Sequence, residues 1–361
     1  MSDSAHWTNV WAQARSLCRI VRACGSAELD LHAPDVPARV THAGRGLVMS
    51  LIRSEAKLES IELTAVLVAV TNEEPRVLTI QNGRALPTGA FASGHRSLQM
   101  GVRAWVEHQT HHPLGYLEQL YTFADRDRVH GGSDQRMISI SYLGLTREAG
   151  VSGEQGPRWH NWYRYFPWED WRDGPSAVIA RAILPRLRRW VSEASDPTIR
   201  RERTHRVEAT FRTDEQGWNE EFVLQRYELL YEAGLVREAG RRRPVVEPLP
   251  SGERMNYDHR RILATGIARL RAKIKYRPIV FELMPSSFTL LQLQRAVEAL
   301  AGRRLHKQNF RRLIEQQGLI EETGEILNET GGRPAKLFRF RREVMLERAV
   351  IGSKLPLSRS A

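Results

Sequence analysis

Cysteine is nearly absent from this 361-residue sequence, which contains only Cys18 and Cys24. The two residues form no CxxC pair, and they cannot build a disulfide framework by themselves. The sequence also lacks an apolar run of membrane-spanning length and a recognisable signal peptide. These absences argue against a disulfide-rich secreted domain and a transmembrane protein, and they predict a cytoplasmic chain with no membrane partner.

Acidic residues are outnumbered along the chain, which has 54 Lys or Arg against 42 Asp or Glu and a net charge of +12. The imbalance is concentrated in residues 271–345, where 15 Lys or Arg face 8 Asp or Glu. Such a local excess favours a polyanionic partner, although a basic soluble protein without one has the same composition. The length is sufficient for two or three domains with cores of their own.

The most basic stretch covers residues 303–312, RRLHKQNFRR, and contains no acid. A helix is predicted before it, because Thr289 and Gln292 form a capping-box pattern and Gly302 is placed to end the helix. A second helix is predicted over 307–317, with Phe310, Leu313 and Ile314 facing inward. The order is then completed by a strand at 319–322, a glycine-rich tip at 324–334 and a returning strand at 336–342, KLFRFRR.

Helix, turn, helix, strand, wing and strand are the parts of a winged helix-turn-helix, whose second helix reads the major groove of duplex DNA. Outward-facing side chains of that helix are expected to reach base edges, namely Lys307, Gln308, Asn309, Arg311 and Arg312. Four further basic residues are expected to bind phosphates, namely Arg303, Arg304, Arg333 and Lys336. Winged helices also bind other proteins, so the alternative is a protein-interaction module.

The preceding half of the chain has the pattern of a layered α/β or α+β domain. Strands are predicted at 61–70, 76–81, 116–123 and 137–145, and a helix at 97–109. Residues 146–175 are interpreted as a long linker that contains seven aromatic residues within thirteen positions. These rings either stack on a base or a partner, or pack on their own domain, and the second interpretation is favoured.

Residues 176–257 are predicted to be a separate helical section. Its segment YELLYEAGLVRE is similar to the later FRRLIEQQGLIEE, and both predict a helix, a glycine and a short strand. The likeness fits a second winged-helix-like unit, but it fits equally a common way of ending a helix. A further helix is predicted at 258–274, with one apolar stripe.

The segment LPTGAFASGHRSLQMGVRAWVEHQ resembles the signature of Nudix hydrolases, G-x5-E-x7-R-E-U-x-E-E-x-G-U, but lacks most of its carboxylates. Gly89, Arg103 and Glu107 match, whereas His95, Ala104 and His108 stand where the signature has glutamates. A single carboxylate is a poor magnesium site, so we predict no metal, no catalytic residues and no enzyme. The histidines, with His111 and His112, could form a zinc site, although a polar helix end before Pro113 is the favoured interpretation.

The degenerate box, the segments YLEQLYTFADRDR and RMISISYLGL, and a C-terminal run that includes YRPIVFELMP and FRRLIEQQGLIE are together similar to the NrtR family. The N-terminal length and the extra section at 176–257 are more like the related NadQ regulators. The resemblance implies an α+β chain: an extension at 1–45, a Nudix-like α/β/α sandwich at 46–275 with its helical insertion, a winged helix at 276–345, and a tail at 346–361.

The resemblance also implies a function. It suggests a homodimeric repressor that binds a palindromic operator near genes of NAD biosynthesis or salvage and needs no cofactor. The implied effector is ADP-ribose for NrtR-type proteins and NAD or ATP for NadQ-type proteins, and the changed box favours the latter. The residues expected to bind it are Arg84, Phe91, Arg103 and Glu107. The alternatives are a Nudix pyrophosphatase acting on ADP-ribose or NAD with an appended nucleic-acid module, and an RNA-binding or scaffold protein.

Overall fold

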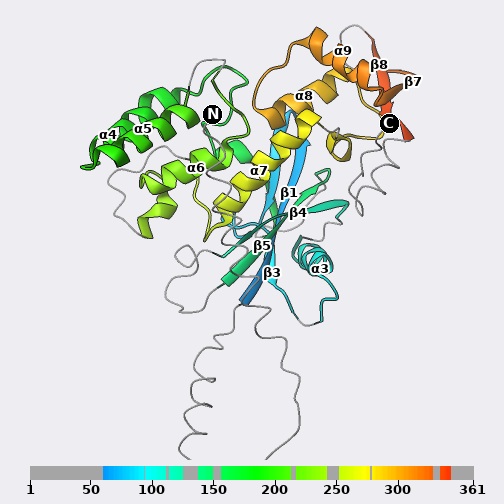
Figure 1. The fold of residues 1–361 in the computed structure, drawn as a ribbon. Coiled ribbons are helices and arrows are strands. Elements are labelled where there is room, and N and C mark those ends of the chain that lie inside the picture. Colours follow the sequence, from blue (N-terminus) through cyan, green and yellow to red (C-terminus); the bar gives the residue numbers. More distant parts are fainter. Residues whose placement is uncertain are drawn as a thin grey trace, which may run out of the picture. The chain divides into compact units, whose positions relative to one another are not determined.

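The structure is a computed structural model that describes residues 60–92, 94–110, 114–124, 137–148, 156–212, 217–241, 252–276, 279–327 and 334–342 (Figure 1). The segments predicted as the extension 1–45 and the tail 346–361 lie outside these residues, as do Arg333, His111 and His112. No helix in the described ranges combines the length and apolarity needed to cross a bilayer. The domain limits given above remain predictions.

The central element is strand β1 (Ser60–Thr71), which lies in the middle of a sheet of order β4-β5-β1-β2-β6. Its apolar run explains this position, because a strand covered on both faces needs apolar residues on both. Strand β5 (Met137–Leu145) pairs with it in parallel. Strands β2 (Glu74–Thr79) and β3 (Thr88–Ala90) pair antiparallel with its other side, and β4 (Tyr116–Phe123) extends the sheet beyond β5.

Two helices cover opposite faces of this sheet. Leu63 and Leu67 of β1 share one buried cluster with residues of α3 (Leu98–Thr110). Val66 lies on the other face, under α7 (His259–Tyr276), which comes so close that a Cβ at Gly266 would lie 2.9 Å from the Val66 side chain. The predicted α/β/α sandwich and the α+β class are therefore confirmed.

The aromatic segment is part of the core and not a linker. Strand β6 (Arg158–Asn161) pairs with β2, and the 3-10 helix η1 (Trp162–Arg164) follows it directly. The rings of this segment that are buried come from Trp159, Trp162, Tyr163, Tyr165, Phe166 and Trp168. The favoured interpretation, packing on the chain's own domain, is correct, and these six rings are not available to stack on a base.

A helical section follows the aromatic segment. It contains a π-helical turn η2 (Ile179–Ile183), then α4 (Leu184–Ser192), α5 (Pro197–Thr210) and α6 (Val223–Glu232). After α6 and Gly234 the chain forms a 3-10 helix, η3 (Arg237–Arg241), where a strand was predicted. The interpretation of this section as a second winged-helix-like unit is therefore wrong, because the element that would start a wing is helical.

The C-terminal part has the predicted order of a winged helix. A 3-10 helix η4 (Ile279–Leu283) precedes α8 (Leu290–Ala301) and α9 (Lys307–Gln317), and β7 (Ile320–Leu327) pairs antiparallel with β8 (Ala335–Phe340). The Thr289 side chain accepts a hydrogen bond from the Gln292 amide at 3.2 Å, and the Gln292 side chain accepts one from the Thr289 amide at 2.8 Å. The predicted capping box is thus present.

Candidate nucleic-acid interface

The outer face of α9 consists of exposed polar side chains, and the opposite face of the helix packs on the core. Phe310 and Ile314 are buried and hold the helix on the core, 6% and 9% exposed. The five residues predicted to reach base edges are all exposed: Lys307, Gln308, Asn309, Arg311 and Arg312. Their side chains form no hydrogen bond or ion pair with any other described residue. The helix therefore presents three cations and two amides to solvent.

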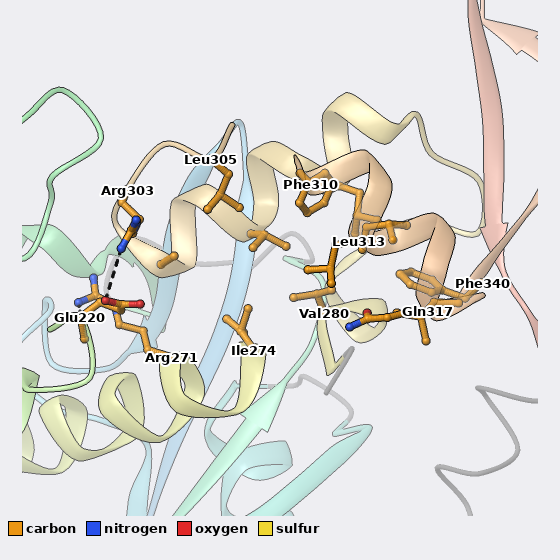
Figure 2. Close-up of a pocket in the computed structure, with 15 residues that line it drawn as sticks. Glu220, Arg271, Ile274, Val280, Arg303, Leu305, Phe310, Leu313, Gln317 and Phe340 are labelled. Carbon is orange, nitrogen blue, oxygen red and sulfur yellow. Dashed lines mark hydrogen bonds and ion pairs between the residues drawn. The ribbon is translucent and has the colours of Figure 1, made fainter. Parts of the chain in front are cut away.

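One prediction about this helix is wrong. Leu313 was expected to face inward with Phe310 and Ile314, but its side chain is 50% exposed. It lines an apolar groove of about 280 Å³ that runs under α9, between α8 and the end of α7. Figure 2 shows Leu313 beside Val280 and Phe310 in this groove, with Arg303 at one end and Phe340 at the other. The apolar spacing along α9 is regular, but the neighbouring elements do not close over this position.

The turn between α8 and α9 is held by one buried carboxylate. Gly302 ends α8 with a left-handed φ of 74°. Glu298, 1% exposed, accepts a hydrogen bond from the Leu305 amide at 2.9 Å and one from Gln294 at 2.8 Å. Arg295 and Arg304 also donate to it, at 3.0 and 3.1 Å. Because these groups come from both sides of the turn, Glu298 fixes where α9 begins.

The same contacts set the protonation of this carboxylate. Burial by itself acts to raise the pKa of Glu298. The hydrogen bonds from the Leu305 amide, Gln294 and the two arginines outweigh burial and hold the pKa below its usual range. Glu298 is therefore an anion at neutral pH, which is the state that the turn requires.

The two arginines before α9 are already shared with acids of the chain. Arg303 lies 3.8 Å from Glu220, the pair joined by a dashed line in Figure 2. Arg304 is paired with Glu298, and it lies 3.6 Å from the exposed Asp173. Both arginine side chains are about half exposed, so a phosphate could compete for them. Their predicted role at phosphates stays a prediction.

The wing continues the basic surface in part. Lys336 donates to both Glu322 oxygens at 2.9 and 3.0 Å, and Arg339 donates to Glu321 at 2.7 Å. The sequence did not predict an isolated β-bridge, in which the Phe288 and Phe338 backbones exchange two hydrogen bonds, at 2.9 and 2.8 Å. This bridge attaches the chain before α8 to the wing.

The four residues predicted to bind an effector come from three parts of the chain, namely α3, the loop before it and the turn after β2. Arg103 on α3 donates to the Leu114 and Gly115 carbonyl oxygens, at 2.5 and 2.9 Å, and so braces the start of β4. Glu107 is exposed on the same helix, and the Phe91 ring lies 5.7 Å from the His95 ring. Arg84 lies instead in the turn after β2, where its carbonyl oxygen accepts from the Asn256 amide at 2.6 Å.

The loop of the degenerate box is packed closely against α3. A Cβ at Gly89 would lie 2.1 Å from the Trp105 ring, whose Nε1 donates to the Ala90 carbonyl oxygen at 2.7 Å. Gln109 donates to the Thr88 carbonyl oxygen at 2.6 Å and accepts from the Thr88 amide at 3.2 Å. Within the described ranges, no three His, Cys, Asp or Glu side chains are grouped as metal ligands would be.

A second cavity, of about 300 Å³, lies between the end of α6 and the start of α7. Arg237, Arg254 and Tyr257 are among its lining residues, together with Glu238 and Asp258. None of the four predicted effector residues lines either this cavity or the groove under α9. The site for an effector therefore stays a prediction from the resemblance.

Comparison with known proteins gives the C-terminal part a family. Residues 280–340 match the NrtR DNA-binding winged helix domain. One curated relative, the ADPR responsive transcriptional repressor NtrR of Acinetobacter baylyi, is 40% identical over 84 residues, 23% of this chain and 33% of the relative. The chain thus matches about a third of the length of that relative.

Solved structures that are similar to this chain include Shewanella oneidensis NrtR complexed with a 27mer DNA, at 19% identity and a TM-score of 0.48, covering 79% of this chain and 94% of that one. A MutT/nudix family protein from Enterococcus faecalis is 16% identical with a TM-score of 0.46, covering 94% of this chain and 100% of that one.

Proposed function

Because residues 280–340 form a winged helix domain of the NrtR type, we propose that this chain is a transcriptional repressor controlled by an adenine nucleotide. The observation that carries the proposal is the outer face of α9, where Lys307, Arg311 and Arg312 are exposed and make no ion pair with any described residue. Elsewhere on the described winged helix, basic side chains such as Lys336 and Arg339 are paired with acids. Unpaired cations on a well-anchored helix are available for DNA.

Each exposed residue has a role that follows from its chemistry. Arginine donates two hydrogen bonds to the edge of guanine, and asparagine or glutamine pairs in the same way with adenine. Lys307, Gln308 and Asn309 occupy the first turn of α9, the part of a recognition helix that reaches base edges. Arg303, Arg304, Arg333 and Lys336 would bind phosphates and fix the register on the duplex. A homodimer would place two such helices on the half-sites of a palindromic operator.

The sensing function is proposed for the Nudix-like sandwich. The A. baylyi relative is named as responsive to ADPR, which supports ADP-ribose as the effector of this chain, with NAD and ATP as the other candidates. The expected targets are genes of NAD biosynthesis or salvage, and the site of action is the cytoplasm. With one glutamate left in the box, the domain would bind its nucleotide without hydrolysing it.

Enrichment of a duplex from a random-sequence pool tests the DNA-binding part. The wild-type protein should enrich one duplex, and it should bind that duplex more tightly than a scrambled duplex of the same length at fixed salt. Arg311→Ala should weaken binding to the enriched duplex, because the side chain is exposed and makes no ion pair that the fold needs. Unchanged affinity for Arg311→Ala would exclude α9 as the reading element.

A further inference from the structure

A buried carboxylate connects three parts of the chain that are distant in sequence. Glu169 lies in the turn after the buried aromatic segment and is 1% exposed. Its Oε1 and Oε2 accept hydrogen bonds from Arg226 at 2.6 and 2.9 Å, and Oε2 also accepts one from Arg271 at 2.7 Å. Both arginine side chains are fully buried. Two cations and one anion thus share a site from which water is excluded.

The first arginine comes from the helical section. Arg226 lies on α6, and its Nη1 donates to the Thr210 and Asn219 carbonyl oxygens at 3.2 and 3.0 Å. Its guanidinium is centred 3.7 Å above the Trp218 ring. These contacts fix the end of α5 and the segment before α6. The position of Glu169 is therefore tied to the packing of the helical section.

The second arginine reaches the winged helix. Arg271 lies on α7, and its Nε donates to the Leu300 carbonyl oxygen at 2.9 Å. The neighbouring carbonyl, that of Ala299, accepts a hydrogen bond from the Tyr163 hydroxyl at 2.7 Å. Carbonyl oxygens in the last turn of a helix have no partner within that helix. At the end of α8, the carbonyl oxygens of Ala299 and Leu300 accept hydrogen bonds from outside the winged helix, from Tyr163 of η1 and Arg271 of α7.

The glycine that ends α8 completes the connection. The Gly302 carbonyl oxygen accepts a hydrogen bond from the Trp171 amide at 2.7 Å. A Cβ at Gly302 would lie 2.5 Å from the Glu169 carbonyl oxygen, so only glycine permits this approach. Gly302 is followed directly by the turn that leads into α9. Glu169 and Arg271 are therefore in contact with the end of α8, directly before the turn into α9.

Stability alone is a poor explanation for such a site. Removing two arginines and a glutamate from water is unfavourable, and apolar residues of similar size often serve stability equally well. Directional hydrogen bonds do what apolar packing cannot, because they fix one orientation of each partner. Figure 2 shows Arg271 next to Glu220 and Arg303, at the end of the groove under α9, so the site borders the element that it would orient.

We propose that Glu169 is a positioning residue for DNA recognition: with Arg226 and Arg271 it sets the orientation of α9 and transmits rearrangements of the helical section to it. The proposal rests on the proposed function in so far as α9 reads DNA. It assigns a role in DNA recognition to the helical section.

Two hydroxyl deletions give a mild and matched test. Tyr163→Phe removes the hydrogen bond to the Ala299 carbonyl oxygen of the winged helix and a longer one, of 3.4 Å, that the Tyr163 hydroxyl accepts from Arg271. Tyr165→Phe removes a buried hydrogen bond to the Gly83 carbonyl oxygen, 2.6 Å long, whose two residues lie outside the winged helix. Each change should destabilise the fold by a similar amount. Only Tyr163→Phe should lower the ratio of affinities for the enriched and the scrambled duplex, by about fivefold, since specific binding depends on geometry. Equal ratios for both variants would overturn the proposal.

Two arginine replacements on α7 extend the test. Arg271→Met disconnects Glu169 from α8, and Arg260→Met is the control, because Arg260 is also fully buried and paired, with Glu238 at 3.2 Å. Arg271→Met should lower the affinity ratio by at least about tenfold, and Arg260→Met by less than about twofold. Arg226 forms its hydrogen bonds with Glu169, Thr210 and Asn219, and with no described residue of the winged helix. Arg226→Met should nevertheless behave like Arg271→Met. A ratio for Arg226→Met equal to that of Arg260→Met would contradict transmission from the helical section.

Hydrogen exchange without DNA separates this proposal from the proposed function. The amides of residues 303–307 should exchange faster in Tyr163→Phe and Arg271→Met than in their two controls. If the wild-type protein enriches no duplex, the proposed function fails, while faster exchange in these two variants still supports the positioning role. If exchange in the turn is the same in all four variants, the positioning role is wrong whatever the DNA result.

Discussion

The outer face of α9 and the degenerate box around α3 both contain charged residues that were predicted from the sequence to bind a ligand. The fold leaves the charged residues of α9 exposed but uses one of those on α3 in its own hydrogen bonds. On α9 the predicted cations are exposed, while Phe310 and Ile314 fix the helix. On α3, Arg103 is bound to two backbone carbonyls. A charged residue in a motif is most available for a ligand where the fold does not already use it.

The largest effect is expected at Glu298, which holds the turn before α9. Glu298→Ala leaves the partly buried Leu305 amide and two arginines without their acceptor, and should lower the free energy of unfolding by about 3 kcal/mol. Thermal and urea unfolding measure the loss. Arg206→Ala, which breaks an exposed pair with Glu232, is the control and should cost less than about 1 kcal/mol. Similar losses in both variants would show that the turn does not depend on this carboxylate.

A charge reversal on α9 tests whether its exposed cations bind DNA. Arg311→Glu should weaken binding to the enriched duplex by roughly thirtyfold, about 2 kcal/mol, without changing the melting temperature. Arg201→Glu makes the same change of net charge on an exposed residue of α5 and serves as the control. Equal weakening by the two would mean that net charge, and not α9, governs the affinity.

Around α3 the expected effect is on stability alone. Gly89→Ala places a Cβ 2.1 Å from the Trp105 ring and should destabilise the fold by about 1 to 3 kcal/mol. Gly94→Ala is the matched control, since nothing lies within 4 Å of its Cβ. Binding to the enriched duplex, measured well below the melting temperature, should be the same for both. A loss of specific binding in Gly89→Ala alone would show that the box acts on DNA recognition directly.

Glu298→Gln should change the pH dependence of the melting temperature, an effect smaller than those above. Because the folded-state pKa of Glu298 lies below its ordinary value of 4.5, this residue stabilises the fold above that pH. The contribution is lost as the pH falls through the folded-state pKa. Glu298→Gln should therefore be less stable than wild type near neutral pH, and the gap in melting temperature should narrow in acid. A gap that is independent of pH would contradict the assignment.

No effect at all is expected when Glu107 is replaced in a hydrolysis assay. Wild type and Glu107→Gln should both fail to release AMP from ADP-ribose or NAD in Mg²⁺ or Mn²⁺, because one carboxylate is a poor site for these ions. Chelation of divalent ions should leave DNA binding unchanged. Turnover by wild type that Glu107→Gln abolishes would establish the pyrophosphatase alternative.

Local signals made the winged helix predictable from the sequence. Thr289, Gln292 and Gly302 act within a few residues of their own positions, so the limits of α8 followed from them directly. The run at β1 likewise needed only its own apolar residues. The exposure of Leu313 did not follow, because helical spacing defines an apolar face but not whether a neighbour covers it.

The Glu169 site was out of reach for a different reason. Its carboxylate and the two arginines are separated by 57 and 102 positions, and each by itself resembles an ordinary surface charge. The same holds for the bridge between Phe288 and Phe338 and for the aromatic segment that becomes β6. Pairings between distant residues depend on the whole topology, and a single sequence carries no pattern that identifies them.

Titration of the enriched duplex with wild-type protein, at fixed salt, with and without ADP-ribose, NAD or ATP, tests the central claim most directly. A nucleotide-controlled repressor predicts specific binding whose affinity changes by at least about fivefold with one of these nucleotides. Specific binding that no nucleotide alters, or binding that does not distinguish the enriched from the scrambled duplex, would contradict it.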